Sequence, residues 1–388
     1  MARQKRRSHK IILLLVAVVA SLFIAELTLR IASFSNPYLY TFEDQTGWTL
    51  RPNTAGWVRK EGEAYVRINH DGQRDDEDHP KQKPAKTFRI AVLGDSFVEA
   101  LQVPDEETFL KLLPRDLNGC KQLNGLSVDV LNFGVSNYGT AQELLALRSR
   151  VWEYQPDLVV LVFTPANDIR NNSRELERDE LRPYFVDHEG KLVADMSFRD
   201  SAVHKQKMGR LNQMMYWAIN RSRLLQLLNS LKESYQARRG GGAAGSVEAG
   251  IDDQSFAAPK DKTWTEAWQI TEKLIGEMNA EVKQHGARFM VVSGTFGPQV
   301  DPNVSKRVVL ANKLGVTDLL YPGQRLVSLG ANGGFPVLDL VPPFQIYATQ
   351  NNTSLHGFGS TINQGHWNQA GHKLVSHLVA EEICKIER

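Results

Sequence analysis

The sequence predicts an α/β fold in which helices cover both faces of a parallel sheet. Two observations carry this prediction: five short apolar runs, several rich in β-branched residues, and helical spacing between them. The runs are 88–93, 128–133, 158–163, 289–292 and 335–340. Apolar runs this short are typical of strands that are buried on both faces. Because strand then helix, repeated, implies right-handed crossovers, we expect a three-layer sandwich around a five-stranded parallel sheet.

The stretches between the runs have apolar residues three and four positions apart. This spacing predicts helices around 144–151, 264–282 and 374–383. By contrast, Pro114 disfavours a helix after the first run, because proline lacks the N–H group that a helix interior needs. Trp264 lies on the second of these helices, where we expect it in the core rather than in a sugar-binding surface.

Composition excludes several classes of protein. The chain has 388 residues, of which 42% are hydrophobic, so it can bury a sizeable core and is neither disordered nor collagen-like. Lysine and arginine together number 46 against 44 aspartates and glutamates, but five of the cations lie within the first ten residues, which contain no acid. The rest of the chain is therefore acidic overall and carries no electrostatic footprint for nucleic acid.

The N-terminus has the pattern of a membrane helix. Residues 11–25 are apolar except for Ser21, and the five cations precede them. Continued to residue 29, this stretch would form a helix about 28 Å long, close to the ~30 Å hydrocarbon core of a bilayer. Large residues interrupt the small ones that a signal peptidase would need, so we expect residues 1–30 to be an uncleaved anchor. The alternatives are a cleaved signal peptide and a buried helix of the soluble domain.

Two regions do not follow the alternation of strands and helices. Residues 31–86 are polar and read as a lead-in segment that is irregular or contains hairpins. An insertion at about 171–260 is expected to be helical, above all at 208–235, and able to lie over one face of the domain. Residues 238–255, rich in glycine and alanine, are expected to be flexible. We therefore divide the chain into an anchor, the lead-in, and a domain at 87–388 that carries the insertion.

Polar residues follow four of the five predicted strands. Ser96 follows the first, Gly134 the second and Asn167 the third, and His366 lies between the fifth and the last predicted helix. In open parallel sheets, ligands bind at the edge formed by the carboxyl ends of the strands. A lone Asp-Ser is most often a helix cap and a lone Asn-Asp a turn, but the four in this order indicate one catalytic site.

These blocks resemble those of the SGNH or GDSL-type hydrolases. The matching blocks are GDSF at 94–97, the glycine block at 132–143, PAND at 165–168 and GHWN at 365–368. The resemblance implies a flavodoxin-like sandwich and acyl-ester chemistry that needs no cofactor. It further implies Ser96 as nucleophile, His366 as base, and an oxyanion hole made by the N–H groups of Ser96 and Gly134 and the side chain of Asn167. The lead-in is similar to the segment before this domain in membrane-anchored bacterial members linked to surface polysaccharide.

One position departs from the pattern of this family. An aspartate usually stands two or three residues before the histidine, where this chain has Gln364 and Asn363. An amide can fix the imidazole tautomer but cannot stabilise its positive charge, and the same change in a serine protease costs roughly 10⁴-fold in kcat. Asp339, at the end of the fifth strand, is a substitute if the loop folds back. A Ser-His dyad, a rescued triad and a non-catalytic glycan-binding relic all stay open.

Other histidines offer competing interpretations. His356 lies close enough in sequence to compete with His366 as base, although we favour loop packing. His366, His372 and His377 do not share one helical face, so we expect no metal site. We also expect Trp367 to be able to line the substrate cleft.

The expected protein is thus a membrane-anchored esterase with its catalytic domain in the periplasm. Its substrate is expected to be an acylated surface glycan or a small acyl ester. Two alternatives remain: an O-acyltransferase that uses the same serine and histidine, and a catalytically silent binding or assembly module.

The two cysteines, Cys120 and Cys384, are 264 positions apart. In a flavodoxin-like sheet the helices after the first and last strands cover the same face, and each cysteine lies at or just beyond the end of one of them. A disulfide between them in an oxidising compartment is therefore one hypothesis, although two independent buried thiols are the commoner state of free cysteines, and the sequence does not decide between the two.

Overall fold

Five parallel strands form the central sheet in a computed structural model that describes residues 2–239 and 253–387. The sheet has the order β11-β10-β7-β5-β6, and every neighbouring pair is parallel. The strands are β5 (Thr87–Gly94), β6 (Ser127–Gly134), β7 (Leu158–Phe163), β10 (Arg288–Ser293) and β11 (Val337–Asp339). The predicted α/β fold with a five-stranded parallel sheet is therefore confirmed.

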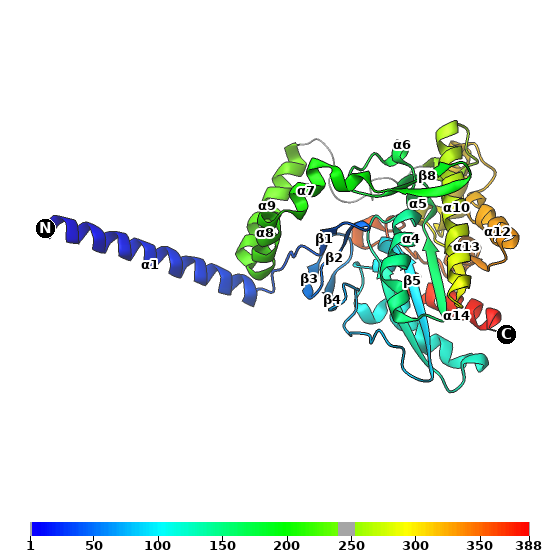
Figure 1. The fold of residues 1–388 in the computed structure, drawn as a ribbon, viewed down its shortest axis with the longest axis horizontal. Helices are drawn as coiled ribbons and strands as arrows, with labels where there is room; N and C mark the ends of the chain where they lie inside the picture. Colours follow the sequence, from blue (N-terminus) through cyan, green and yellow to red (C-terminus); the bar gives the residue numbers. More distant parts are fainter. Residues whose placement is uncertain (1, 240–252, 388) are drawn as a thin grey trace.

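Helices pack on both faces of this sheet (Figure 1). Along β5, Ala91 and Leu93 enter one hydrophobic core, which α4 (Thr140–Ser149) and α10 (Lys262–Gln284) cover. The alternate residues Ile90 and Val92 enter the other core, beneath α3 (Phe109–Asp116) and α14 (Gln369–Ile386). Side chains of a strand point to opposite faces in turn, so one apolar run supplies both cores and the domain has three layers.

Shorter helices complete the domain. They are α2 (Ser96–Glu99), α5 (Pro165–Asn171), α6 (Arg174–Glu177), α11 (Val304–Leu314), α12 (Tyr321–Gly333) and α13 (Val341–Asn351). The expectation that Pro114 prevents a helix after the first strand is wrong, since Pro114 lies inside α3. The Thr108 side chain caps this helix by accepting from the Lys111 N–H, and packing on the sheet offsets the one hydrogen bond that proline removes.

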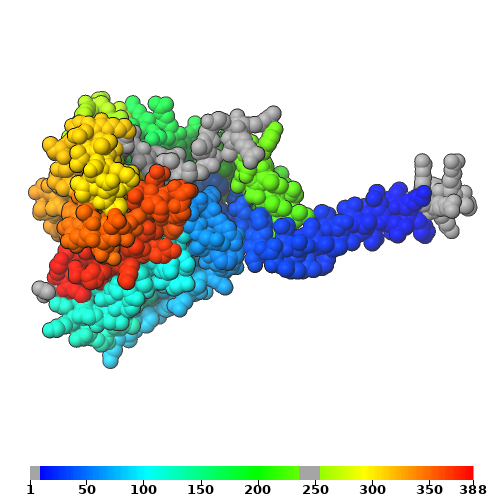
Figure 2. Space-filling view, turned by 180° about the vertical axis from the view of Figure 1, so that it is seen from behind, coloured from blue at the N-terminus to red at the C-terminus, as the bar shows by residue number. Residues whose placement is uncertain are grey.

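The N-terminal helix α1 (Ala2–Ile31) projects away from the rest of the protein (Figures 1 and 2). Within its segment His9–Ile31, a window of 18 residues has a mean hydropathy of 2.7 and is not buried, and the segment is long and apolar enough to cross a membrane. The helix is thus not buried in the body that the structure describes, and its role as an anchor stays a prediction. The side chains of the basic flank up to residue 8 lie outside the described part of the structure.

The lead-in contains two antiparallel hairpins, as expected. One joins β1 (Tyr40–Glu43) to β2 (Gly47–Leu50), and the other joins β3 (Thr54–Val58) to β4 (Ala64–Ile68). Buried side chains of β2 and β4, among them Leu50 and Val66, belong to the same core as α4 and α10. The lead-in therefore packs on the domain. The division of the chain at residue 87 stays a prediction.

The insertion is largely helical, as expected, but after the short helix α6 it contains a hairpin that the sequence did not predict. This hairpin joins β8 (Tyr184–His188) to β9 (Lys191–Asp195), and it is followed by α7 (Ala202–Met208), α8 (Arg210–Arg221) and α9 (Arg223–Arg239). Helices α8 and α9 lie beside the end of α1 rather than over a face of the sheet (Figure 1). Most of the stretch expected to be flexible, 238–255, lies outside the described residues.

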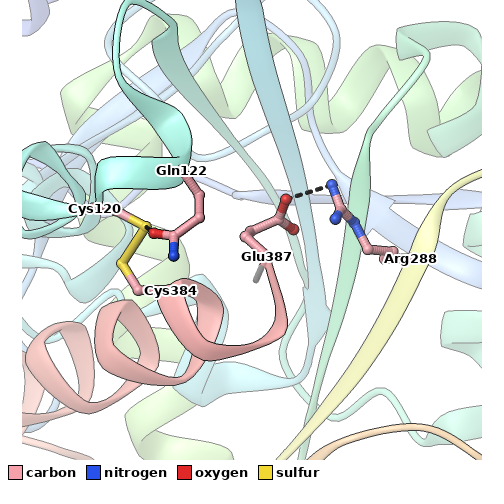
Figure 3. The surroundings of a disulfide bond; sticks show 5 residues. All are labelled: Cys120, Gln122, Arg288, Cys384 and Glu387. Atoms are coloured by element: carbon pink, nitrogen blue, oxygen red, sulfur yellow. Dashed lines mark hydrogen bonds and ion pairs between the residues drawn. A yellow bond between two sulfur atoms is a disulfide. The ribbon is translucent and has the colours of Figure 1, made fainter.

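A disulfide joins Cys120 to Cys384, so the structure has the bridge that the sequence left open rather than two independent thiols (Figure 3). Their Cα atoms are 5.5 Å apart, within the usual range for a disulfide. Helices α3 and α14 lie side by side, and the Ser376 hydroxyl donates to Asp116 Oδ2 at 2.6 Å across them. The disulfide therefore fastens the last helix of the chain to the segment between the first and second strands of the sheet.

Candidate active site

Ser96 lies where β5 ends and α2 begins. Asp95 caps α2, and its Oδ1 accepts from the Phe97 N–H at 3.0 Å. The turn is tight, since a Cβ on Gly94 would lie 2.4 Å from Val98 Cγ2. Ser96 is only 2% exposed. A buried hydroxyl at the carboxyl edge of the sheet is thus fixed by the strand before it and the helix after it.

His366 meets this hydroxyl from the other end of the chain. Its Nε2 atom lies 2.8 Å from Ser96 Oγ, within the distance that we expect of a nucleophile and its base. His366 stands in the loop before α14, where its carbonyl accepts from the Gly357 N–H at 2.9 Å. The Phe97 ring, with its centroid 5.0 Å away, packs against the imidazole. Sequence reasoning thus predicted this pair correctly as neighbours.

The carboxylate beside His366 is Glu61, which sequence reasoning missed. Glu61 Oε2 lies 2.8 Å from His366 Nδ1, and the same oxygen accepts from the His366 backbone N–H at 3.3 Å. Glu61 thus occupies the position beside Nδ1 for which the sequence suggested Gln364, Asn363 or Asp339. Ser96, His366 and Glu61 form a continuous chain of hydrogen bonds, with both ring nitrogens engaged.

Glu61 comes from the turn between β3 and β4 in the lead-in. The turn approaches the domain so closely that a Cβ on Gly62 would lie 2.0 Å from the Gln102 carbonyl oxygen. On the other side, Gly365 has a φ of +65°, and a Cβ there would lie 2.8 Å from Glu61 Oε2. Gly365, directly before His366, is therefore the sequence signal that another residue packs closely against this position. The glycine alone does not indicate which of the chain's 44 acidic residues that is.

The three residues expected near Nδ1 serve local structure instead. Asp339 Oδ1 accepts from the Val341 N–H at 3.0 Å at the start of α13, and burial raises the pKa of this carboxyl. Asn363 has a φ of +64°, and its N–H donates to the His356 carbonyl at 3.0 Å. The Gln364 N–H donates to the Thr361 carbonyl at 3.0 Å. The backbone of the last two thus shapes the loop that carries His366.

Asn167 lies in the first turns of α5 and faces the Asp95–Ser96 turn. Its Nδ2 donates to Asp95 Oδ2 at 2.8 Å, while Asp95 Oδ1 also accepts from the Thr164 hydroxyl at 3.1 Å. Asp95 therefore sets the orientation of the Asn167 amide as well as capping α2. The structure brings Asn167 to the site that the sequence predicted for it.

Gly134 lies at the end of β6, where its N–H donates to the Asn132 side-chain oxygen at 2.9 Å. Its predicted part in the oxyanion hole stays a prediction. A Cβ at this position would lie 2.4 Å from the Glu99 nitrogen and 2.6 Å from Val98 Cβ. The residue is glycine because α2 packs directly on the end of β6.

The remaining aromatic candidates form a buried network behind the site. His356 Nδ1 donates to the Gly365 carbonyl at 2.8 Å, and its Nε2 lies 2.8 Å from the Thr295 hydroxyl, which accepts from Trp367 Nε1 at 2.9 Å. Burial lowers the pKa of His356 to about 4, so the ring is neutral. His356 thus packs within the loop, the role that we favoured over that of a competing base. Trp367 is fully buried and does not line a cleft.

Histidine at 372 is also a packing residue. It accepts from the Phe109 N–H at 3.3 Å, and burial lowers its pKa to about 3. Within residues 2–239 and 253–387, no group of three or more histidine, cysteine or acidic side chains is arranged to hold a metal ion.

A second buried carboxyl lies beneath Asn167. Asp168 accepts from the Thr140 hydroxyl at 3.1 Å and from the Thr164 N–H at 2.6 Å. Neither carboxyl oxygen of the neighbouring Glu143 has a hydrogen-bond partner among the described residues. Burial, followed by the charges of Asp168 and Asp95, raises the pKa of Glu143 above its ordinary value. Hydrogen bonds from Thr140 and Thr164 hold Asp168 in place beside it.

Comparisons with known proteins give distant structural likenesses. The chain is similar to the acetyl xylan esterase AlAXEase, with 13% identity, coverage of 76% of this chain and 100% of that chain, and a TM-score of 0.38. It is similar to a lipase/acylhydrolase from Enterococcus faecalis, with 16% identity, 77% and 96% coverage, and a TM-score of 0.38. Axe2, an acetylxylan esterase from Geobacillus stearothermophilus, gives 10% identity, 76% and 94% coverage, and a TM-score of 0.38.

No protein-family model matches the chain, and no curated protein matches it in sequence. Likeness at this level carries no inference about activity. The chemistry of the site is therefore argued from its own atoms.

Proposed function

We propose that this protein is a serine esterase of the SGNH type, with Ser96 as nucleophile, His366 as base and Glu61 as the residue that orients the base. One observation carries the proposal: Ser96 Oγ, His366 and Glu61 are joined by hydrogen bonds of 2.8 Å on either side of the imidazole. The sequence blocks that resemble SGNH hydrolases support the same assignment independently of this geometry.

The proposed reaction is acyl transfer through Ser96. His366 Nε2 takes the proton of Ser96 Oγ as this oxygen attacks the acyl carbon, and returns it to the leaving alcohol. Water then attacks the acyl-serine, loses its proton to the same nitrogen, and releases the carboxylic acid. Glu61 keeps the Nδ1–H tautomer in place and stabilises the imidazolium that forms twice in each cycle.

The oxyanion of the tetrahedral intermediate is proposed to be held by the Ser96 N–H and the Asn167 side chain. The Gly134 N–H, which donates to the Asn132 side chain within β6, is proposed as the third donor, and the loop that follows offers a further candidate. Asn137 is the candidate: it is exposed, has a φ of +62°, and its carbonyl accepts from Arg182 Nη2 at 3.0 Å and from Asn171. Asn171 lies one turn beyond Asn167 on α5, which places this loop at the same end of the sheet.

The substrate is proposed to be an acylated surface glycan or a small acyl ester, met outside the cytoplasm. Three features support this location: the apolar helix His9–Ile31, the basic residues before it, and the disulfide between Cys120 and Cys384. Disulfides persist in oxidising compartments, and a basic flank favours the cytoplasmic side. The catalytic domain is thus assigned to the periplasm, with α1 as its anchor.

Transfer of the acyl group to a sugar hydroxyl is the second candidate. Ser96 and His366 are 2% and 5% exposed, so an acyl-serine at this position is shielded from bulk water. The silent-module alternative rested on a missing carboxylate, and Glu61 supplies one.

The test measures acid release from p-nitrophenyl acetate and from an acetylated oligosaccharide, with and without an acceptor sugar. Ser96→Ala and His366→Ala should abolish release, and Asn167→Ala should lower kcat roughly 10²- to 10³-fold. Ser149→Ala is the matched control, since its hydroxyl bonds to the Leu145 carbonyl within α4. Full activity in Ser96→Ala would overturn the proposal, and acylated acceptor in place of free acid would identify a transferase.

A further inference from the structure

Helices α8 and α9 carry an apolar surface that no described part of the protein covers. The exposed side chains on α8 are Leu211, Met214, Met215 and Trp217, and those on α9 are Leu225, Leu228 and Leu231. Leu211 is 82% exposed and Met214 68%. The opposite face packs on the lead-in, where the ring centroids of Tyr216 and Tyr38 are 4.8 Å apart. The helix pair α8–α9 is therefore apolar on two sides. One side packs on the lead-in, and no described part of the protein covers the other.

The corner between these helices is fastened to the last two turns of α1. Glu26 accepts from the backbone N–H groups of Arg223 and Leu224, each at 3.0 Å, and so caps the start of α9. Arg30 donates to the Arg221 carbonyl at 2.8 Å and so caps the end of α8. Glu26 and Arg30 also form an ion pair at 2.7 Å. Two charged residues near the end of the apolar helix are thus used to hold this corner.

The clamp fixes the level of the corner along α1. The 23 residues of His9–Ile31 make a helix about 35 Å long, a few ångströms more than the ~30 Å hydrocarbon core. Glu26 is five residues, or about 8 Å, from the end of that segment. Helices that lie in a membrane interface sink about 5–10 Å into it. If α1 spans the membrane, the corner therefore lies near the boundary between the headgroups and the acyl chains.

The orientation and charge of the helix pair suit the same environment. Figure 1 shows α8 and α9 crossing the end of α1, on the side of the body from which α1 projects. Residues 210–239 contain six basic residues and one acidic residue, although the chain after its first ten residues is acidic overall. Trp217 lies under the Arg221 guanidinium at 4.1 Å from its ring centroid, a pairing suited to the boundary between lipid and water. A cavity of about 260 Å³ beside the clamp is lined by Arg30 and Arg223 among others.

We infer that α8 and α9 form a second membrane contact, lying in the interface of the outer leaflet with their exposed apolar side chains among the lipids. The partner is an anionic lipid surface. This inference rests on the anchoring proposed above, and it assigns to the insertion the role of holding the catalytic domain at a fixed orientation over the bilayer.

Spin labels can measure this contact in the full-length protein reconstituted in single-copy nanodiscs of phosphatidylglycerol and phosphatidylcholine. Both native cysteines are in the disulfide, so an introduced cysteine takes the nitroxide alone. Trp217→Cys and Leu228→Cys place labels on the helix pair, and Val19→Cys places one in α1. Val309→Cys on α11, where Val309 is 67% exposed, is the matched control for an exposed apolar residue remote from the pair.

The measured quantity is the collision rate of each label with oxygen, which partitions into lipid, relative to a water-soluble nickel chelate. We expect this ratio at positions 217 and 228 to exceed that at 309 several-fold, and to be highest at 19. Equal ratios at 217, 228 and 309, with a high ratio at 19, would overturn the second contact and leave the anchor standing. A low ratio at 19 would overturn both. Retention of the wild-type melting temperature shows that each variant is folded.

Discussion

Glu61 reaches His366 because two neighbouring residues lack side chains. A Cβ on Gly365 would press on the Glu61 carboxylate, and a Cβ on Gly62 would overlap the Gln102 carbonyl oxygen. The carboxylate then makes two hydrogen bonds to one residue, to the ring and to the backbone of His366. This arrangement fixes both the position and the tautomer of the base. The negative charge of the Glu61 carboxylate also stabilises the positive charge that forms on the imidazole during attack.

Removing that charge should slow catalysis without preventing substrate binding. We expect Glu61→Gln to lower kcat for p-nitrophenyl acetate roughly 10²- to 10⁴-fold with little change in KM, since Glu61 acts through His366. The control is Glu63→Gln in the same turn, where Glu63 is exposed and forms an ion pair with Arg59 at 2.9 Å. Equal kcat in both variants would contradict an orienting role for Glu61.

The motif-based alternative makes the opposite prediction at a neighbouring position. Because Nδ1 of His366 is already bonded to Glu61, we expect Gln364→Asp to give no increase in kcat. A clear increase in the same assay would mean that residue 364, rather than Glu61, faces the ring in solution.

At the scale of elements, the lead-in is part of the catalytic domain rather than a spacer. The β3–β4 hairpin delivers Glu61, and the segment after β4 is fastened to the sheet by His79. This imidazole lies 2.8 Å from Asp129 on β6 and 3.1 Å from Asp75. Burial lowers the pKa of His79, but hydrogen bonds to Asp129 and Asp75 outweigh it and raise the pKa to about 9.

This junction should make stability depend on pH. The folded-state pKa of His79 lies above its ordinary value of 6.5, so its stabilisation is complete below pH 6.5 and is lost as the pH rises through about 9. We expect the wild-type free energy of unfolding to fall between pH 6 and pH 9.5, and to fall less in His79→Gln. The exposed His70, changed to glutamine, is the control. An identical pH dependence in wild type and His79→Gln would contradict the assignment.

The elements differ in how far the sequence determines them. All six residues of β7 are buried, so its continuous apolar run could be recognised without further information. In the β8–β9 hairpin only Tyr184 and Phe185 are buried, which leaves no pattern to read. Ser96, Asn167 and His366 were predictable because each follows or precedes a recognisable element. Glu61 was not, since its role depends on a contact between residues 305 positions apart.

At the scale of the whole molecule, contacts between segments far apart in the sequence lie at both ends of the sheet. The lead-in reaches His366 at the carboxyl edge, and the disulfide joins α14 to the segment after α3. Beyond the disulfide, Glu387 forms an ion pair with Arg288 at the start of β10, 2.5 Å apart (Figure 3). The helix that follows His366 is therefore fixed at its far end.

Breaking the disulfide should destabilise the protein. A closed loop of this length stabilises by up to about 5 kcal/mol in the entropic model. We expect Cys120→Ser with Cys384→Ser, or reduction of the wild type, to lower the free energy of unfolding by roughly 2–5 kcal/mol, measured by denaturant titration. A reductant should not affect the double variant. Two free thiols in oxidised, denatured wild type would contradict the pairing.

Labelling with a fluorophosphonate probe tests the central claim, the activated serine, most directly. The probe phosphonylates a serine hydroxyl only where a base removes its proton, so it reports on Ser96, His366 and Glu61 together. The account predicts one adduct, located on Ser96 by mass spectrometry, absent in Ser96→Ala and His366→Ala, and formed more slowly in Glu61→Gln. Wild type that stays unlabelled while folded, or Ser96→Ala that labels as fast as wild type, would contradict it.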